Sequence, residues 1–279
     1  MIKRSIIITG GASGIGLGIT THFAPHPNTH ITILDVNPET ASQALKNLSS
    51  QFPSCSISFK PCNVASWESQ AEAFESVFAE QGRVDVVFAN AGITEKGRLL
   101  PTAEERVGGK PSKPDLKTLD VNLVGVLYSI KLGIHYISKN TPQAPLSGPP
   151  SKGSIICTSS NAGHYAFPIA PLYAATKHGV TGLVRSLARS LEREQIQINA
   201  LAPAVIETNI APDVALFKSM IMTPMETVTK AVEELVSDSS LTGKVAELHG
   251  ERVSYAEPQP YVDEDTETNI ETFWRLGYA

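Results

Sequence analysis

Two residues of this sequence, Tyr173 and Lys177, have the types and the spacing for proton transfer. The segment around them predicts a helix, on which residues four positions apart lie on one face about one turn from each other. An ammonium group held close to a phenol stabilises the phenolate and lowers a pKa that is about 10 in water. The pair is therefore a candidate general base, although a helix with one core tyrosine and one solvated lysine has the same pattern.

A glycine-rich turn near the start of the chain has the composition of a dinucleotide phosphate site. It lies between a predicted strand, Ser5–Thr9, and a helical stretch from Leu17 to about Ala24. Gly10, Gly14 and Gly16 let the backbone turn tightly and approach a pyrophosphate, whose charge is met by the N–H groups of the helix N-terminus. A Walker-type phosphate loop is excluded, because Leu17 stands where lysine and then Ser or Thr would follow. The turn therefore indicates a nicotinamide dinucleotide.

Asp35 ends a second predicted strand, His30–Leu34, about 20 residues beyond the glycine turn. An acid at this place accepts hydrogen bonds from the adenosine ribose hydroxyls and would repel a 2′-phosphate. Neither Val36 nor Asn37 is a cation, and the glycine turn contains none. We therefore expect NAD in preference to NADP, whereas an aspartate that only caps a turn before Pro38 is the structural alternative.

Further motifs follow in order along the chain. Asn90-Ala91-Gly92 comes directly after a predicted strand over 84–89, Asn122 lies on a long predicted helix, and Ser160 precedes Tyr173 by thirteen residues. Together with the glycine turn, these motifs resemble the short-chain dehydrogenase/reductase family in its compact single-domain form, over about 5–250. A narrower likeness, over 131–139 and 173–179, points to the branch that contains 15-hydroxyprostaglandin dehydrogenase.

The resemblance implies a role for each of four catalytic residues. Tyr173 would exchange a proton with the substrate hydroxyl, and Lys177 would hold the tyrosine pKa down while binding the nicotinamide ribose. Ser160 would donate a hydrogen bond to the substrate oxygen as charge develops there. Asn122 would support a water that links Lys177 to solvent. The structural alternatives are that Ser160 caps a loop and that Asn122 makes an ordinary polar contact within a helix.

The resemblance also implies a cofactor-binding set, and the chain departs from the family at two of its places. Asn63 stands where the family usually has an aspartate that contacts adenine, and Ala204 follows Pro203 where the family has glycine. An asparagine keeps an acceptor and adds a donor, so we expect the adenine contact to survive. Thr208, five residues beyond Pro203, still matches the position that binds the carboxamide. The set comprises Gly10, Ser13, Gly14, Ile15, Gly16, Asp35, Asn63, Val64, Asn90, Ala91, Gly92, Tyr173, Lys177, Pro203, Ile206 and Thr208.

Composition is typical of a soluble α/β protein. The chain has 279 residues and a net charge of −5, from 23 basic and 28 acidic residues, which leaves no basic footprint for nucleic acid. No apolar run approaches the roughly 20 residues needed to span a bilayer, and the N-terminal residues lead into a strand rather than forming a signal peptide. Cys55, Cys62 and Cys157 are expected as core thiols in a reducing, cytoplasmic location. The spacing of potential ligands predicts no metal site.

The alternation of strand and helix patterns predicts one α/β domain over 1–279, with a C-terminal tail at 255–279. We expect a doubly wound, Rossmann-type parallel sheet of about seven strands with helices on both faces. Two proline-rich stretches, 96–114 and 140–152, are predicted surface loops, the second on the side away from the site. Family likeness implies a homodimer or homotetramer built on the helices that start near Lys117 and Tyr173. The predicted strands are 5–9, 30–34, 56–60, 84–89, 154–158, 197–200 and 245–249.

Loops beyond the carboxyl ends of the strands are expected to build the substrate pocket, because ligands of such sheets bind there. These loops carry apolar side chains and little fixed charge, which favours a lipophilic secondary alcohol or ketone. Two alternatives remain: an NADPH-dependent ketone reductase, which Asp35 opposes, and a catalytically silent dinucleotide-binding protein. The expected apolar wall comprises Tyr165, Phe167, Ile169, Ile206, Ile210, Leu216, Phe217, Met220, Ile221 and Met222.

Overall fold

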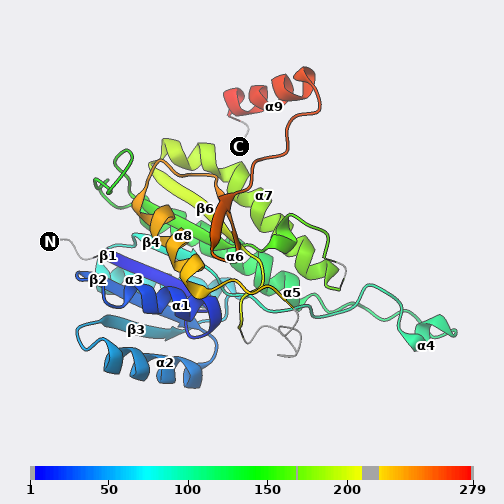
Figure 1. Ribbon diagram of the computed structural model, residues 1–279, viewed down its shortest axis with the longest axis horizontal. Coiled ribbons are helices and arrows are strands. Elements are labelled where there is room, and N and C mark those ends of the chain that lie inside the picture. The colour runs from blue at the N-terminus through cyan, green and yellow to red at the C-terminus, as the bar shows by residue number, and fades with distance from the viewer. Residues whose placement is uncertain (1–3, 168, 209–219, 278–279) are drawn as a thin grey trace.

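The computed structural model describes residues 4–167, 169–208 and 220–277, and an eight-stranded sheet runs through its centre (Figure 1). The strand order is β3-β2-β1-β4-β5-β6-β7-β8; β1 to β7 are parallel and β8 pairs antiparallel with β7. The order reverses beside β1, which is the arrangement of a doubly wound sheet. The strands are β1 Arg4–Thr9, β2 Thr29–Asp35, β3 Ser56–Pro61, β4 Val86–Ala89, β5 Gly153–Thr158, β6 Ile196–Pro203, β7 Val245–His249 and β8 Arg252–Tyr255.

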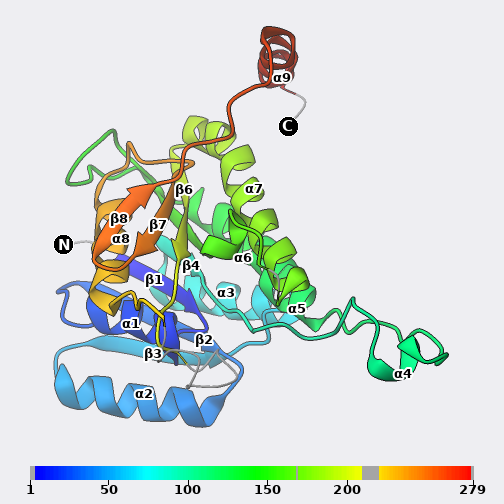
Figure 2. The same ribbon diagram turned by 45° about the vertical axis from the view of Figure 1, so that its right-hand side comes forward.

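Helices cover both faces of the sheet, and β-branched strand residues supply the two cores. Successive side chains of a strand point to opposite faces. Ile6 and Ile8 accordingly pack in one buried cluster with residues of α1 and α8, while Ile7 packs in another with residues of α3, α6 and α7. Figure 2 shows these two layers on either side of the sheet. The helices are α1 Gly14–Phe23, α2 Pro38–Gln51, α3 Trp67–Gln81, α4 Ala103–Arg106, α5 Lys117–Leu119, α6 Gly125–Ile137, α7 Pro171–Arg193, α8 Met225–Ser237 and α9 Glu264–Leu276.

The predicted fold class is confirmed, with one strand added. All seven predicted strands are present, although β4 begins at Val86, two residues later than expected. The expectation of about seven strands missed β8, a four-residue strand that reverses direction after Gly250, whose φ is 55°. The helix predicted to run through Asn122 is interrupted: a π-helical turn, Asp120–Val124, separates α5 from α6.

Two segments extend from the body of the protein. The predicted loop at 96–114 forms an arm that carries α4, whose first turn is closed by a capping box between Thr102 and Glu105. The tail carries α9, which stands off the body in Figures 1 and 2. Arg189 of α7 holds α9 through a bidentate pair with Glu271, and the Arg189 guanidinium lies 5.1 Å from the Trp274 ring.

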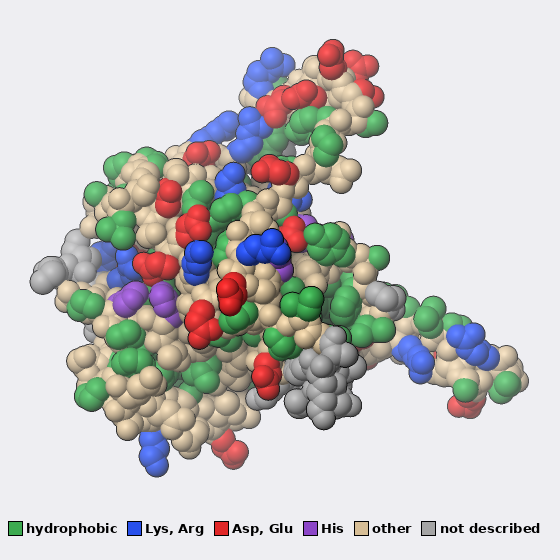
Figure 3. Space-filling view, viewed as in Figure 1, with side chains coloured by type: hydrophobic (Ala, Val, Ile, Leu, Met, Phe, Trp, Pro, Cys, Tyr) green, Lys and Arg blue, Asp and Glu red, His purple; other side chains and the backbone are tan. Residues whose placement is uncertain are grey.

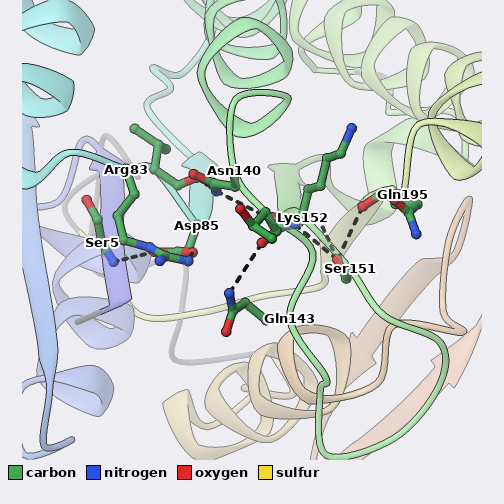
Figure 4. A network of polar contacts seen from close by, with 11 residues as sticks. Ser5, Arg83, Asp85, Asn140, Gln143, Ser151, Lys152 and Gln195 are labelled. Atoms are coloured by element: carbon green, nitrogen blue, oxygen red, sulfur yellow. Dashed lines mark hydrogen bonds and ion pairs between the residues drawn. The ribbon is translucent and has the colours of Figure 1, made fainter. Parts of the chain in front are cut away.

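The predicted loop at 140–152 lies beside Asp85 and Gly153, at the amino ends of β4 and β5, whereas the candidate site lies at the carboxyl ends of the strands. Figure 4 shows the contacts of this loop. Asn140 donates to the carbonyl of Lys152, and Gln143 and Ser151 exchange backbone hydrogen bonds. Beside them the carboxylate of Asp85 binds the backbone N–H of Ser5 and the guanidinium of Arg83. This network fixes the base of the sheet. Within the residues that the structure describes, no helix is long and apolar enough to cross a membrane.

Candidate active site

The turn between β1 and α1 presents backbone N–H groups at the carboxyl edge of the sheet. Gly10 and Gly14 have φ values of 63° and 51°, a region that glycine adopts without strain. The Ser13 side chain makes no capping hydrogen bond to α1, so the N–H groups of the first turn stay available to a ligand. Gly16 serves packing: a methyl group there would overlap the carbonyl oxygen of Gly10 and approach Asn90 Nδ2 to 2.7 Å.

Asp35 is held at the end of β2 beside this turn. One carboxylate oxygen accepts a hydrogen bond from the N–H of Ala12 at 3.2 Å, and the other accepts from the N–H of Asn37 at 3.1 Å. The neighbouring Val36 is 73% exposed, and no salt bridge among the described residues involves Asp35. The carboxylate is therefore oriented by the backbone, and no cation of the described residues pairs with it.

Hydrogen bonds from β1 and β5 fix the segment that follows β4. The Thr9 hydroxyl accepts from the N–H groups of Asn90 and Ala91 at 2.9 and 3.0 Å. The Asn90 side chain donates to the Thr9 carbonyl and accepts from the hydroxyl of Thr158 at 3.0 Å. Three adjacent strands thus place Asn90, Ala91 and Gly92 at the floor of the site.

Tyr173, Lys177 and Ser160 line the same pocket. Lys177 is 3% exposed, its ammonium donates to the Thr158 carbonyl at 2.7 Å, and it lies 5.4 Å from the centre of the Tyr173 ring. Ser160 accepts a hydrogen bond from the N–H of Ala162 at 3.2 Å, so it does cap a turn. Its hydroxyl donates to Asn161 Oδ1 at 3.0 Å, and Ser160 lines the pocket together with Tyr173, so capping a turn is compatible with a chemical role.

Burial dominates the electrostatics of this group. It lowers the pKa of Lys177 from 10.5 to about 8. It also raises the pKa of Tyr173, while a hydrogen bond from Ser160 acts in the opposite direction. Desolvation of the phenolate thus acts against the expected lowering of the tyrosine pKa, and the role of Lys177 in that lowering stays a prediction.

Asn122 is fully buried in the π-helical turn and binds the segment after β4. Its side-chain oxygen accepts from the N–H of Ile93, and its side-chain nitrogen donates to the Ile93 carbonyl, both at 2.8 Å. A methyl group on Gly92 would lie 3.4 Å from Asn122 Oδ1 and 3.7 Å from Lys177 Nζ. Asn122 is therefore close to the lysine but engaged with the backbone, and it does not line the pocket.

Glu95 is a site residue that the sequence analysis missed. Its carboxylate accepts hydrogen bonds from the N–H groups of Leu172 and Tyr173, at 3.2 and 2.7 Å, at the start of α7. A negative charge at a helix N-terminus satisfies free N–H groups and interacts favourably with the helix dipole. The loop after β4 thereby fixes the helix that carries the tyrosine. A separation of 78 positions hides this contact from any local motif.

A pocket of about 650 Å³ connects these groups. Asp35, Asn63 and Val64 lie with the glycine turn, and Ser160, Tyr173 and Lys177 lie with Pro203 and Ala204. Every predicted site residue lines the pocket except Gly16 and Asn122. The lining residues that were not predicted for the site are Leu34, Val36, Cys62, Ile93, Thr94, Lys96, Lys117, Val121, Thr158, Ser159 and Ala204.

The expected apolar wall is represented in the pocket lining by one residue, and the ring centre of Phe167 lies 6.3 Å from that of Tyr173. Ile206 alone of the predicted set lines the pocket among the described residues, and Lys96 and Lys117 add positive charge that the analysis did not expect. These differences arise because loop conformation, rather than position after a strand, decides which side chains face the pocket. Tyr165, Phe167, Ile169, Met220 and Ile221 are exposed, Met222 lies elsewhere, and Ile210, Leu216 and Phe217 fall outside the described residues.

A family model described as short chain dehydrogenase matches residues 4–218 of this chain. The protein is a short-chain dehydrogenase/reductase. This confirms the resemblance drawn from its motifs, and it places the protein among the NAD(P)-dependent alcohol dehydrogenases and reductases. The narrower likeness to the 15-hydroxyprostaglandin dehydrogenase branch stays a prediction.

Relatives of the protein occur in filamentous fungi. It is 31% identical to short-chain dehydrogenase/reductase prx7 of Penicillium rubens, over 82% of this chain and 79% of the relative. It is also 31% identical to 5'-hydroxyaverantin dehydrogenase of Dothistroma septosporum, over 97% and 89%. Among solved structures, gox2181 superposes with a TM-score of 0.73 at 27% identity, covering 88% of this chain and 94% of the other. Actinorhodin polyketide ketoreductase, at 23% identity and a TM-score of 0.73, shares the fold.

Proposed function

We propose that this short-chain dehydrogenase/reductase uses NAD to interconvert a secondary alcohol and a ketone on a hydrophobic small molecule. One observation carries the proposal: Tyr173, Ser160 and Lys177 meet at one end of a pocket whose other end holds the unpaired carboxylate of Asp35. The first group suits proton transfer to an oxygen, and the carboxylate suits a ribose with free hydroxyls.

The residues present fit a dinucleotide. Gly14 and Thr208 both line the pocket, and a methyl group on Gly14 would lie 3.3 Å from Thr208. Available N–H groups at the start of α1 would hold the pyrophosphate, and Asp35 would bind the adenosine ribose. Asn63 uses its side-chain oxygen to accept from the N–H of Ala65 at 3.1 Å, which leaves its amide nitrogen as the donor toward adenine. When bound, NAD⁺ supplies the hydride acceptor and a positive charge near the phenol.

The protein's own groups then handle the proton. Ser160 donates a hydrogen bond to the substrate oxygen, which keeps that oxygen beside the Tyr173 hydroxyl. The Tyr173 phenolate accepts the alcohol proton during oxidation, and in reduction the phenol returns it. Lys177⁺ stabilises the phenolate, and its bond to the Thr158 carbonyl fixes the ammonium at the site. Asn122 holds the Ile93 backbone, so it acts on the lysine through the geometry of the floor.

Two alternatives are weaker. NADPH-dependent reduction would place a 2′-phosphate against Asp35, with no partner cation in a described salt bridge. A silent dinucleotide-binding protein would have no need for Tyr173, Ser160 and Lys177 at one pocket. We therefore expect oxidation of an alcohol to be the working direction.

Substrate, assembly and location are part of the same proposal. A hydrophobic substrate such as a terpenoid, polyketide, steroid or fatty-acid derivative is supported by a relative named 5'-hydroxyaverantin dehydrogenase. A homodimer or homotetramer would cover exposed apolar side chains on the projecting α9, including Phe273 and Leu276. A reducing, cytoplasmic location agrees with three free cysteines. Size-exclusion chromatography with light scattering tests the assembly.

The decisive experiment supplies a panel of lipophilic secondary alcohols with NAD⁺ or NADP⁺ and follows formation of the reduced cofactor. Tyr173→Phe removes only the hydroxyl, so we expect a loss of about a hundredfold or more in turnover with normal NAD⁺ affinity. The matched control is Tyr261→Phe, because Tyr261 is 45% exposed and absent from the pocket. Turnover of Tyr173→Phe equal to that of the control would remove Tyr173 from the mechanism.

A further inference from the structure

Two histidines near the end of α1 and one glutamate of α8 bring metal-ligating atoms together outside the active site. Ligand atoms of His22, His26 and Glu233 all lie within 4.8 Å of one another, and His22 Nε2 is 3.0 Å from Glu233 Oε2. The three side chains are half-buried, and none lines the dinucleotide pocket. Figure 3 shows histidine side chains next to acidic ones on the surface that α1 and α8 form.

The donor set and its spacing fit a late divalent transition ion. Zinc binds imidazole nitrogen and carboxylate oxygen at about 2.0–2.2 Å, which places the ligand atoms of a tetrahedral shell roughly 3.4 Å apart. Small side-chain rotations would bring the three groups to that spacing. The His22 and His26 ring centres are 5.3 Å apart with the planes at 67°. Two imidazoles on one tetrahedral ion have ring centres about 5 Å apart, so the rings are already near the required positions.

The backbone around His26 is restricted, which lowers the entropy cost of ligation. His26 stands between Pro25 and Pro27, whose rings fix their own φ angles. The His26 N–H donates to the carbonyl of Phe23 at 3.0 Å. The Phe23 ring is fully buried and lies edge-on to both imidazoles, at 4.9 Å from His22 and 5.3 Å from His26. The core thus positions both histidines before any ion binds.

The charges around the cluster are of both signs. Glu233 contributes a carboxylate, whereas Arg4 lies close enough to His26 to act against an incoming cation.

From this geometry we infer that His22, His26 and Glu233 form a binding site for a divalent late transition ion, with zinc as the ion that fits the donors. The ion would clamp α1 to α8. The sequence analysis expected no metal, because His22 and Glu233 are 211 positions apart and only the packing of α1 on α8 unites them. Water or a further ligand would complete the four-coordinate shell.

The test is calorimetric titration of ZnCl₂ into the full chain after removal of metals with a chelator. We expect about one ion per chain and a raised thermal midpoint, because an ion that binds only the folded protein stabilises it. His26→Gln and Glu233→Gln should each weaken binding about tenfold or more, since loss of a ligand costs at least what loss of a supporting contact does. The exposed His135 of α6 provides the control variant, His135→Gln.

Co²⁺ gives a second measurement that does not depend on stability, because its visible absorption reports coordination number. A four-coordinate spectrum that wild type and His135→Gln share, and that both site variants lose, supports the assignment. Absence of binding by the wild type overturns it. Binding by His26→Gln or Glu233→Gln equal to that of the wild type also overturns it, because the ion would then lie elsewhere. The thermal unfolding midpoints of the variants, measured without metal, show whether each variant folds.

Discussion

Replacing Lys177 by methionine should separate stability from activity. The ammonium is buried, and its pKa falls from 10.5 to about 8. Each pKa unit corresponds to about 1.4 kcal/mol, so holding the charge in the folded protein costs about 3 kcal/mol at neutral pH. In the folded wild type the Lys177 ammonium donates a hydrogen bond to the Thr158 carbonyl. Lys177→Met loses this bond, which cancels about 1–2 kcal/mol of the stability gained by removing the buried charge. We therefore expect Lys177→Met to be up to about 2 kcal/mol more stable than wild type at pH 7, with turnover greatly reduced.

The sign of the pH dependence gives a sharper test. Between about pH 8 and the ordinary lysine pKa, the unfolded chain binds a proton that the folded chain has released. The free energy of unfolding of the wild type should therefore rise with pH across this window. Relative to Lys177→Met, the wild type should gain about 2–3 kcal/mol between about pH 7 and about pH 10. Other titrating groups are common to both proteins and cancel in the difference.

Urea unfolding followed by circular dichroism at several pH values measures this difference. Lys131→Met is the matched control, because Lys131 is exposed on α6 and should leave the profile parallel to that of the wild type. Profiles of wild type and Lys177→Met that stay parallel from neutral to alkaline pH would refute the reasoning. Such a result would mean that the ammonium keeps an ordinary pKa in the folded protein.

Three further predictions concern catalysis and its scaffold. Asp35→Ser with Val36→Arg should weaken NAD binding and allow NADP to bind, because arginine can bind a 2′-phosphate bidentately. A wild type that binds NADP more tightly than NAD in fluorescence titrations would contradict the cofactor proposal. The rate of alcohol oxidation, where chemistry limits it, should rise with pH, since burial raises the pKa of Tyr173 and the phenolate is the reactive form. An oxidation rate that does not change with pH would exclude titration of Tyr173 as a control of this step. Glu95→Ala should cost about 1–2 kcal/mol of stability and lower kcat more than it raises KM, whereas exposed Glu104→Ala should do neither.

The sequence predicted the sheet well because its strands are short β-branched runs separated by helical patterns. Ile6, Ile7 and Ile8 are all buried, as a parallel strand covered on both faces requires. The strand β8 was missed because its residues alternate between exposed and half-buried at the edge of the sheet, and such a strand resembles a loop in composition. Its position depends on pairing with β7, which no local pattern encodes.

The substrate wall could not be predicted in the same way. Motif residues that follow strands converge because a parallel sheet brings the carboxyl ends of its strands to one edge. Loop residues have no such constraint, so Tyr165 turns outward and donates to Glu247 at 3.0 Å, away from the pocket. Lys96 and Lys117 reach the pocket from the base of the arm that carries α4, whose path a sequence pattern does not determine.

Asn122 makes contacts that its motif does not reveal. A buried amide must satisfy its donor and its acceptor, and here the backbone of Ile93 satisfies both. The π-helical turn, with its extra residue, places the amide against that segment. The same segment leads to Glu95, which fixes the start of α7 at Tyr173. Hydrogen bonds at Ile93 and at Glu95, joined by the backbone of Thr94, thus connect Asn122 to the start of α7, and we propose that the asparagine supports proton transfer by holding this segment.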